Sequence, residues 1–251
     1  IPADVAVVGD VKRSLPLITE RIRKRDHSQW IAGFRACDQI EYEAVIRKAV
    51  HPAEGRIRMG EAVAAVARAY RNDAVLVTDV GQQQMNAARY FGFRRTRSVV
   101  TSGGLGTMGF GLPAAIGAKL GNPDKVVVHT TGDGCFRMNC HELATVEHYH
   151  LPIITVVFNN GTLGMVRQWQ NLIYHQRYSE TTLDRGPDFV KLAEAYGLKG
   201  FRVTNMAEME EAFTQALEAG CGCVLDCRLD MDEMVRPMVA GGAHITDFLL
   251  Q

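Results

Sequence analysis

The amino-acid sequence predicts an α/β fold, a doubly wound parallel sheet with helices on both faces. Two observations support this prediction. Short apolar runs rich in Val and Ile alternate along the chain with stretches of helical periodicity. The runs are also almost continuously apolar, which is typical of parallel strands that helices cover on both sides.

The elements follow one another in regular order. The expected strands are residues 5–8, 74–78, 126–130, 153–158 and 223–229. The expected helices between them include residues 61–70, 112–120, 138–148 and 206–219. In the stretch 61–70, the apolar residues recur at the i, i+3, i+4, i+7 spacing of one buried helix face, at Ala62, Ala65, Val66 and Ala69.

A polar break divides the chain near residues 50–57, where His51, Pro52, Glu54 and Gly55 cluster. Before it lie one strand, a helix (VAVVGDVKRSLPLITERI) and two short helical patterns. One strand cannot form a sheet, so residues 1–50 are expected to be the tail of a domain that begins earlier. The first residue, Ile1, likewise suggests a piece of a longer protein. Residues 57–251 suffice for a complete α/β domain.

Composition and charge exclude several classes. Apolar residues make up 47% and charged residues 22%, which excludes a disordered or collagen-like chain. Lys plus Arg and Asp plus Glu both total 28, so no net field selects nucleic acid or an anionic membrane. No apolar run approaches the roughly 18 residues of a membrane helix. The basic clusters at residues 21–25 and 94–97 are interpreted as a solvated helix face and a loop. We expect neither a nucleic-acid partner nor a membrane partner.

The six cysteines, without a secretory signal, favour reduced thiols and a cytoplasmic location. Cys221, Cys223 and Cys227 lack the paired C-x-x-C elements of a structural zinc site. Their apolar surroundings (CGCVLDCRL) favour a buried strand instead.

A glycine-rich segment at residues 104–109 satisfies G-x-G-x-x-G between an apolar run and a helical pattern. Alone it would suggest a dinucleotide-binding turn, which requires an acidic residue about 20 residues further on. The next strand instead leads to Asp133, 29 residues after Gly104. A dinucleotide-dependent oxidoreductase remains an alternative.

A more specific signal is Gly132-Asp133-Gly134 followed, after 24 intervening residues (135–158), by Asn159-Asn160. Each half ends a predicted strand, so both loops should lie at the carboxyl edge of the sheet, where ligands bind. Asp133, Asn160 and the carbonyl of Thr162 offer three oxygens, which suits Mg²⁺ shared with phosphates. The glycines let backbone N–H groups approach those phosphates. The alternative is a tight turn after each strand, with Asp133 as a helix N-cap.

These motifs resemble those of thiamine-diphosphate enzymes, and of acetohydroxyacid (acetolactate) synthase large subunits in particular. The similar segments are TSGGLGTMGFGLPAAIGA, GDGCFRMNCHELATVEHYHLPI, FNNGTLGMVRQWQNLIY and RPMVAGGA. The resemblance covers the whole chain. It implies that residues 57–251 are the C-terminal, diphosphate-binding domain and that residues 1–50 are the end of the central domain plus a linker.

The resemblance also implies a role for individual residues. Asp133, Asn160 and the Thr162 carbonyl would bind Mg²⁺. Thiamine diphosphate would contact Val80, Gly81, Gln82, Gln83, Gly134, Cys135, Leu163, Gly164 and Met165. The Gly106 carbonyl would accept a hydrogen bond from the 4′-amino group of the cofactor, and Met108 would hold the cofactor bent. Trp169 would select the second substrate, and Asp10 and Val11 would touch FAD, if FAD is bound.

Simpler interpretations remain for four of these residues. Met108 could be ordinary core filling, Trp169 a half-buried helix aromatic, and Asp10 and Val11 part of a strand-to-helix turn. Three positions also depart from the family. Gln83 replaces a usual histidine, Asn86 a usual tryptophan and Cys135 a common serine. Gln83 can donate only a neutral hydrogen bond to a phosphate, which leaves room for a related carboligase.

The implied reaction is the decarboxylation of pyruvate and addition of the two-carbon unit to pyruvate or 2-oxobutyrate, in branched-chain amino-acid biosynthesis. The family's activating glutamate lies in an N-terminal domain of a partner chain. No catalytic residue can therefore be assigned here, and the 251-residue chain alone is expected to be inactive. The expected assembly is a homodimer or homotetramer, with a possible small regulatory subunit. The alternatives are another thiamine-diphosphate carboligase or decarboxylase, and a fragment that binds the cofactor without catalysis.

Overall fold

The computed structural model describes residues 2–52, 56–70 and 73–249. The chain divides into two compact units, Ile1–Tyr42 and Glu43–Gln251. The predicted break at residues 50–57 falls partly on Glu54 and Gly55, which lie outside the described residues. The assignment of 1–50 and 57–251 to separate domains stays a prediction.

The first unit contains two helices, α1 (Val11–Thr19) and α2 (Ser28–Glu41). The helix expected after residues 5–8 is present as α1, but the strand expected at residues 5–8 is absent, so that prediction was wrong. A strand is stable only when a neighbour pairs with its backbone groups, and the described residues of this unit offer no such neighbour. An apolar run without a pairing partner therefore stays irregular.

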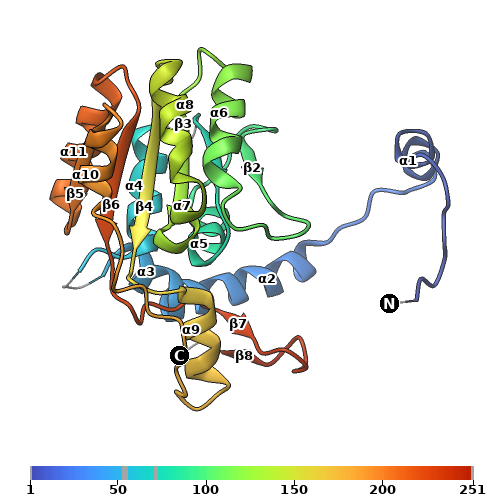
Figure 1. The fold of residues 1–251 in the computed structure, drawn as a ribbon. Coiled ribbons are helices and arrows are strands. Elements are labelled where there is room, and N and C mark those ends of the chain that lie inside the picture. Colours follow the sequence, from blue (N-terminus) through green and yellow to red (C-terminus); the bar gives the residue numbers. More distant parts are fainter. Residues whose placement is uncertain (1, 53–55, 71–72, 250–251) are drawn as a thin grey trace. The chain divides into compact units, whose positions relative to one another are not determined.

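The second unit is built on a six-stranded sheet of order β2-β1-β3-β4-β6-β5 (Figure 1). Every neighbouring pair in it is parallel. The strands are β1 (Val75–Thr78), β2 (Val99–Thr101), β3 (Val127–Gly132), β4 (Ile153–Asn159), β5 (Lys199–Val203) and β6 (Cys223–Arg228). The predicted fold class is confirmed, as are four of the strands, β1, β3, β4 and β6. Cys223 and Cys227 are buried in β6, as their surroundings predicted.

Helices cover both faces of this sheet. One face carries α4 (Met59–Ala69), α5 (Gln82–Tyr90) and α11 (Met206–Glu218). The other carries α6 (Gly111–Gly121), α7 (Asp133–Asn139), α8 (Leu143–His148) and α10 (Phe189–Ala195). The helix predicted at 138–148 comprises the end of α7, a 3₁₀ turn (Cys140–Glu142) and α8. The other predicted helices match α4, α6 and α11.

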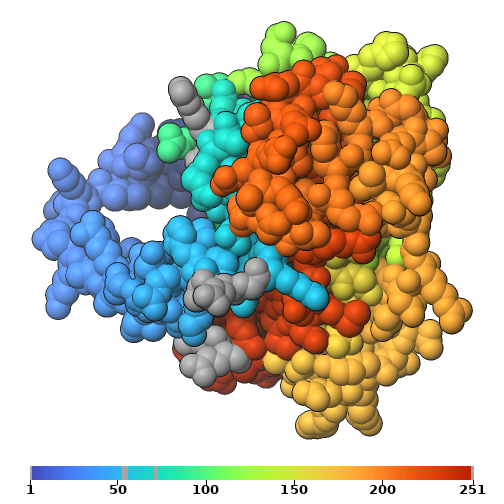
Figure 2. Space-filling view, turned by 90° about the vertical axis from the view of Figure 1, so that its left-hand side faces the viewer, coloured from blue at the N-terminus to red at the C-terminus, as the bar shows by residue number. Residues whose placement is uncertain are grey.

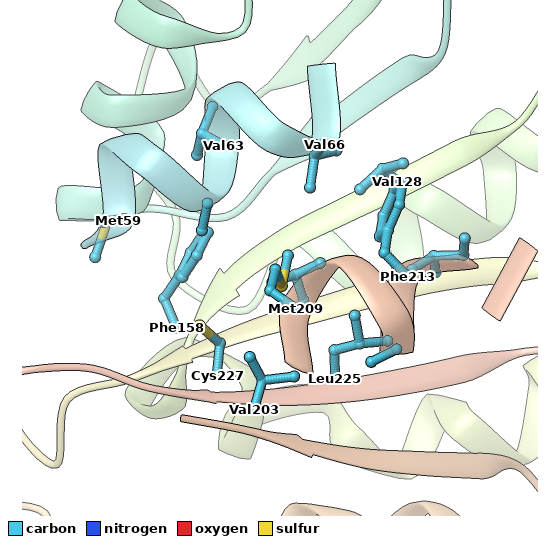
Figure 3. Close-up of a cluster of buried hydrophobic side chains, with 14 of the residues drawn as sticks. Met59, Val63, Val66, Val128, Phe158, Val203, Met209, Phe213, Leu225 and Cys227 are labelled. Carbon is cyan, nitrogen blue, oxygen red and sulfur yellow. The ribbon is translucent and has the colours of Figure 1, made fainter. Parts of the chain in front are cut away.

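The first face holds a large apolar cluster between helices and sheet. Figure 3 shows Val63 and Val66 of α4 pointing toward Met209 and Phe213 of α11, above the strand residue Leu225. On the outer surface, α4 and α11 lie side by side (Figure 2). Burying such side chains is the main source of stability for a domain of this kind.

The connections between strands create a crevice at the carboxyl edge. The chain leaves β1 into α5 on the first face, but it leaves the neighbouring strand β3 into α7 on the second face. A ligand site forms where adjacent strands send the chain to opposite faces. At the same edge lie α9 (Gly164–Leu172) and a two-stranded antiparallel pair, β7 (Met238–Val239) and β8 (Phe248–Leu249) (Figure 1).

The short elements that remain are a π-helix at Tyr42–Ile46 and α3 (Arg47–Val50). In the part of the chain that the structure describes, no helix is long and apolar enough to cross a membrane.

Candidate functional site

A pocket of about 260 Å³ lies in the crevice beyond β1, β3 and β4. It brings together every predicted cofactor-binding and metal-binding residue of the second unit. These are Val80, Gly81, Gln82, Gln83, Gly106, Met108, Asp133, Gly134, Cys135, Asn160, Thr162, Leu163, Gly164 and Met165. They come from the loops that follow three strands, from the first turns of α5, α7 and α9, and from the loop before α6, so segments far apart in sequence meet here.

Asp133 is the most distinctive group in the pocket. It is the first residue of α7 and is 1% exposed. Its Oδ1 accepts the N–H of Gly134 at 3.0 Å, whereas the buried Oδ2 has no hydrogen-bond partner. Burial raises the pKa of this carboxyl to about 6, and the charge of Arg137 and backbone N–H groups oppose the rise. A buried carboxylate oxygen without a donor is unfavourable, and a cation would satisfy it.

The helix-cap alternative for Asp133 is not what the structure shows. Gly132, which has no side chain, occupies the N-cap position of α7, and Asp133 is the first residue of the helix. Asp133 is thus not the N-cap residue: its Oδ1 accepts the N–H of the next helix residue, Gly134, and its Oδ2 has no hydrogen-bond partner among the described residues.

Asn160 follows the last residue of β4 and is 8% exposed. Its Oδ1 accepts the N–H of Thr162 at 3.2 Å, and its Nδ2 donates to Oε1 of Gln82 at 3.3 Å. The hydroxyl of Thr162 donates to the carbonyl of Thr181 at 2.8 Å. These contacts fix the loop that carries the predicted carbonyl ligand.

Two glycines leave the pocket wall without side chains. A Cβ on Gly134 would lie 2.8 Å from Cδ2 of Leu163, and one on Gly164 would collide with the amides of Gln82 and Asn160. The first residues of α5 and α9, Gln82 and Gly164, both line the pocket. Helix N-termini present free N–H groups and a partial positive charge, which suits a phosphate.

The loop before α6 is held by a residue that the sequence analysis missed. Asp79, 1% exposed, accepts the N–H of Gly109 at 3.0 Å through Oδ1 and that of Gly111 at 3.1 Å through Oδ2. Gly106 in this loop has φ +60°, the left-handed region that glycine adopts readily. The available signal was a carboxylate at a strand end, directly before Val80 and Gly81.

Met108 belongs to the same loop. Its terminal methyl lies 3.8 Å from the position that a Cβ on Gly134 would occupy. Met108 is half-buried and lines the pocket, and it belongs to neither buried apolar cluster of the described residues.

Gln82 uses its whole side-chain amide on protein partners. Its Nε2 donates to Oε1 of Gln168 at 3.1 Å and to the carbonyl of Glu233 at 2.8 Å, while its Oε1 accepts from Asn160. The sequence analysis missed Gln168 and Glu233. Glu233 lies 151 residues from Gln82, and no local pattern marks such a partner.

The three departures from the family pattern are buried, and two of them, Gln83 and Cys135, line the pocket. Gln83 donates to the carbonyl of Val80 at 2.6 Å, and Asn86 donates to the carbonyl of Gln82 at 2.9 Å. Cys135 Sγ contacts that same Val80 carbonyl at 3.0 Å, and burial raises the pKa of its thiol to about 12. The Cys135 thiol therefore stays protonated at neutral pH.

The remaining predicted residues lie outside the pocket lining. Trp169 is half-buried on α9. Asp10 and Val11 lie at the start of α1 in the first unit, whereas the pocket consists of second-unit residues.

The chain is similar to proteins of known activity. The family model described as "Thiamine pyrophosphate enzyme, C-terminal TPP binding domain" matches residues 79–227. The "Probable acetolactate synthase large subunit" of Methanocaldococcus jannaschii is 39% identical over 254 residues, which are 99% of this chain and 43% of that protein. The "Acetolactate synthase isozyme 3 large subunit" of Escherichia coli is 38% identical over 263 residues, 100% of this chain and 44% of that protein. The chain thus spans less than half the length of these relatives.

A solved structure agrees in fold. The thiamine diphosphate-dependent 4-hydroxybenzoylformate decarboxylase of Rhodococcus jostii RHA1 superposes with a TM-score of 0.66 at 28% identity, over 72% of this chain and 34% of that one.

Proposed function

We propose, since the chain belongs to the thiamine pyrophosphate enzyme family through its C-terminal TPP-binding domain, that it is the C-terminal part of an acetolactate synthase large subunit. The observation that carries this proposal is the pocket at the switch point of the sheet, which Asp133, with its buried and unpartnered Oδ2, lines together with Asn160. The similarity to acetolactate synthases supports the choice of reaction.

The residues of the pocket fit thiamine diphosphate, the same compound as thiamine pyrophosphate, with Mg²⁺. Oδ2 of Asp133, Oδ1 of Asn160 and the carbonyl of Thr162 would hold the cation. Gly81, Gln83, Gly134, Cys135, Gly164 and Met165 would hold the diphosphate, chiefly through backbone N–H groups. Because the Gln82 amide is already used within the protein, Gln82 would contribute its backbone alone.

The rest of the pocket would hold the ring end of the cofactor. When bound, thiamine diphosphate supplies a nucleophilic carbon and an electron sink for the decarboxylation of a 2-keto acid. The Gly106 carbonyl would accept a hydrogen bond from its 4′-amino group, and Val80, Met108 and Leu163 would supply apolar walls. Asp79 holds the Gly106–Met108 loop in place through its bonds to Gly109 and Gly111.

The proposed substrates are pyruvate as donor and pyruvate or 2-oxobutyrate as acceptor, in branched-chain amino-acid biosynthesis. Trp169 would form a wall of the acceptor channel, and Asp10 and Val11 would contact FAD. The activating glutamate would come from an N-terminal domain of a partner subunit. The proposed assembly is a cytoplasmic homodimer or homotetramer, with a small regulatory subunit where one exists.

The experiment compares acetolactate formation from pyruvate by two samples, both saturated with Mg²⁺ and thiamine diphosphate. One is the 251-residue chain alone, and the other is this chain mixed with the N-terminal region of a full-length acetolactate synthase. We expect activity only in the mixture, because proton transfer by the missing glutamate contributes at least about 10²- to 10⁴-fold. Acetolactate formation by the chain alone would disprove the assignment of the activating group. A mixture that binds both cofactors but releases only an aldehyde would point to a related decarboxylase.

A further inference from the structure

Three buried side-chain amides form a hydrogen-bonded row, called the amide relay here, from the backbone of residues 233–235 to the predicted metal site. They are Gln168 on α9, Gln82 at the start of α5 and Asn160 after β4, which are 2%, 4% and 8% exposed. Two hydrogen bonds link them in a row, one from Gln82 to Gln168 and one from Asn160 to Gln82. An amide is asymmetric, with a donor at one end and an acceptor at the other, so such a chain has a direction.

The direction is set at Val235. Its backbone N–H donates to Oε1 of Gln168 at 2.9 Å, and its backbone carbonyl accepts from Nε2 of Gln168 at 2.9 Å. Backbone groups cannot exchange donor for acceptor. The Gln168 amide can therefore satisfy Val235 in one orientation only.

The orientation of the Gln168 amide in turn fixes that of the Gln82 amide. Oε1 of Gln168 requires a donor, which Nε2 of Gln82 supplies, and the carbonyl of Glu233 accepts a second hydrogen bond from the same nitrogen. Oε1 of Gln82 is thereby turned toward Asn160, where it accepts from Nδ2.

At the pocket end, the hydrogen bond to Gln82 fixes the orientation of the Asn160 amide. With Nδ2 committed to Gln82, Oδ1 faces the N–H of Thr162 and keeps a second lone pair for a cation. The backbone N–H of Thr162 is also a fixed donor. The backbone groups at the two ends of the amide relay, Val235 and Thr162, therefore favour the same orientation of the three amides. A reversed Asn160 would present an NH₂ group to the cation and repel it.

We propose that Gln168 is a positioning residue that acts through Gln82 to keep the oxygen of Asn160, and not its nitrogen, directed at the Mg²⁺ site. The inference rests on the proposed function, because it needs the cation to bind at Asn160. It also gives the 233–235 segment a role, since Val235 and Glu233 supply the backbone groups that set the direction.

The test is a calorimetric titration of the 251-residue chain with Mg²⁺ in the presence of thiamine diphosphate. Gln168→Met keeps the length of the side chain and removes the amide. We expect it to lose about 10- to 100-fold in Mg²⁺ affinity, as is usual when a partner of a metal ligand is removed. Gln168→Glu should recover most of the affinity. A buried carboxyl is protonated readily, and it then accepts from Gln82 and donates to the carbonyl of Val235.

Asn160→Asp separates positioning from a general structural role. A carboxylate presents an oxygen in either orientation, so adding Gln168→Met to Asn160→Asp should leave the Mg²⁺ affinity within about twofold of Asn160→Asp alone. A role in general stability would instead weaken binding equally in both backgrounds, which would overturn the proposal.

The outcomes distinguish this inference from the proposed function. If the wild-type chain binds neither Mg²⁺ nor thiamine diphosphate, both fall. If the wild-type chain binds them and Gln168→Met binds them equally well, the positioning role alone falls. If Gln168→Met does not fold, a crystal structure of the wild-type chain with both ligands decides. Nδ2 of Asn160 on Gln82 and Oδ1 on Mg²⁺ support the relay, and any other arrangement contradicts it.

Discussion

Gly164→Ala perturbs the pocket with a single methyl group. Gly164 is the first residue of α9, and its φ lies outside the left-handed region, so alanine is compatible with its backbone. The new Cβ would collide with Oε1 of Gln82 and lie 2.8 Å from Nδ2 of Asn160. Because Gln82 is 4% exposed, it has no solvent to move into. The side chain of Gln82 or that of Asn160 must therefore break its hydrogen bonds to make room for the methyl group.

The magnitude follows from those hydrogen bonds. Displacing Gln82 breaks its bonds to Gln168, to the carbonyl of Glu233 and to Asn160. Each contributes about 0.5–1.5 kcal/mol net. We therefore expect Gly164→Ala to lower the free energy of unfolding by about 2–4 kcal/mol, and to weaken Mg²⁺ binding as Asn160 moves.

Gly117→Ala is the matched control. Gly117 lies inside α6, where a Cβ would meet nothing within 4 Å, so alanine should stabilise the chain by about 0.5–1 kcal/mol. Urea unfolding followed by circular dichroism measures both variants. A Gly164→Ala protein as stable as Gly117→Ala would refute the tight packing of Gln82 against Gly164.

Three further predictions concern titration and specificity. Burial raises the pKa of Glu233 to about 7 from 4.5, so its contribution to stability is present below pH 4.5 and lost as pH rises through about 7. Glu233→Gln should remove this loss. The difference in unfolding free energy between the wild type and Glu233→Gln should therefore change by about 3 kcal/mol between pH 4 and 8. A difference that stays constant with pH would contradict the burial of that carboxyl. Since the pKa of Asp133 is about 6, Mg²⁺ affinity in calorimetry should rise about tenfold per pH unit below 6 and level off above, and a flat profile would exclude Asp133 as a ligand. In the complete enzyme, Trp169→Leu should shift the ratio of products from 2-oxobutyrate and pyruvate more than the rate of the first decarboxylation, and an unchanged ratio in competition assays would make Trp169 an ordinary helix aromatic.

The strands that could be predicted from sequence are the ones buried on both faces. Helices cover β3 and β4 on both sides, so β4 is apolar over most of its length and β3 begins in an apolar run at residues 126–128. β2 and β5 are the two ends of the strand order, and both are partly exposed. The polar residues that exposure permits, such as Lys199 and Arg202 in β5, break the apolar pattern and hide the strand.

Residues 5–8 show the opposite error, a strand that the sequence predicts and the structure lacks. The run VAVV has the composition of a buried strand, but composition does not supply a pairing partner. Strand formation depends on a neighbour that no local pattern reveals.

The predicted metal-binding residues could be derived from the sequence because they lie at two strand ends, whereas the other pocket residues were assigned from the family resemblance. Asp133 and Asn160 each follow a strand directly, and parallel strands bring such loops to one edge. The residues that orient them could not be predicted in the same way. Gln168 looks like any polar helix residue until the backbone of Val235, 67 residues away, is placed beside it.

The most direct test of the account is a calorimetric titration of the chain with thiamine diphosphate, with Mg²⁺ and then with EDTA, for the wild type and Asp133→Ala. We expect the wild type to bind in Mg²⁺ only, and Asp133→Ala to bind at least about tenfold more weakly. Because Asp133→Ala removes a buried, unpartnered oxygen, its unfolding free energy should equal or exceed that of the wild type. Equal affinity in EDTA, or in a folded Asp133→Ala protein, would contradict the assignment of this pocket as a metal-dependent thiamine diphosphate site.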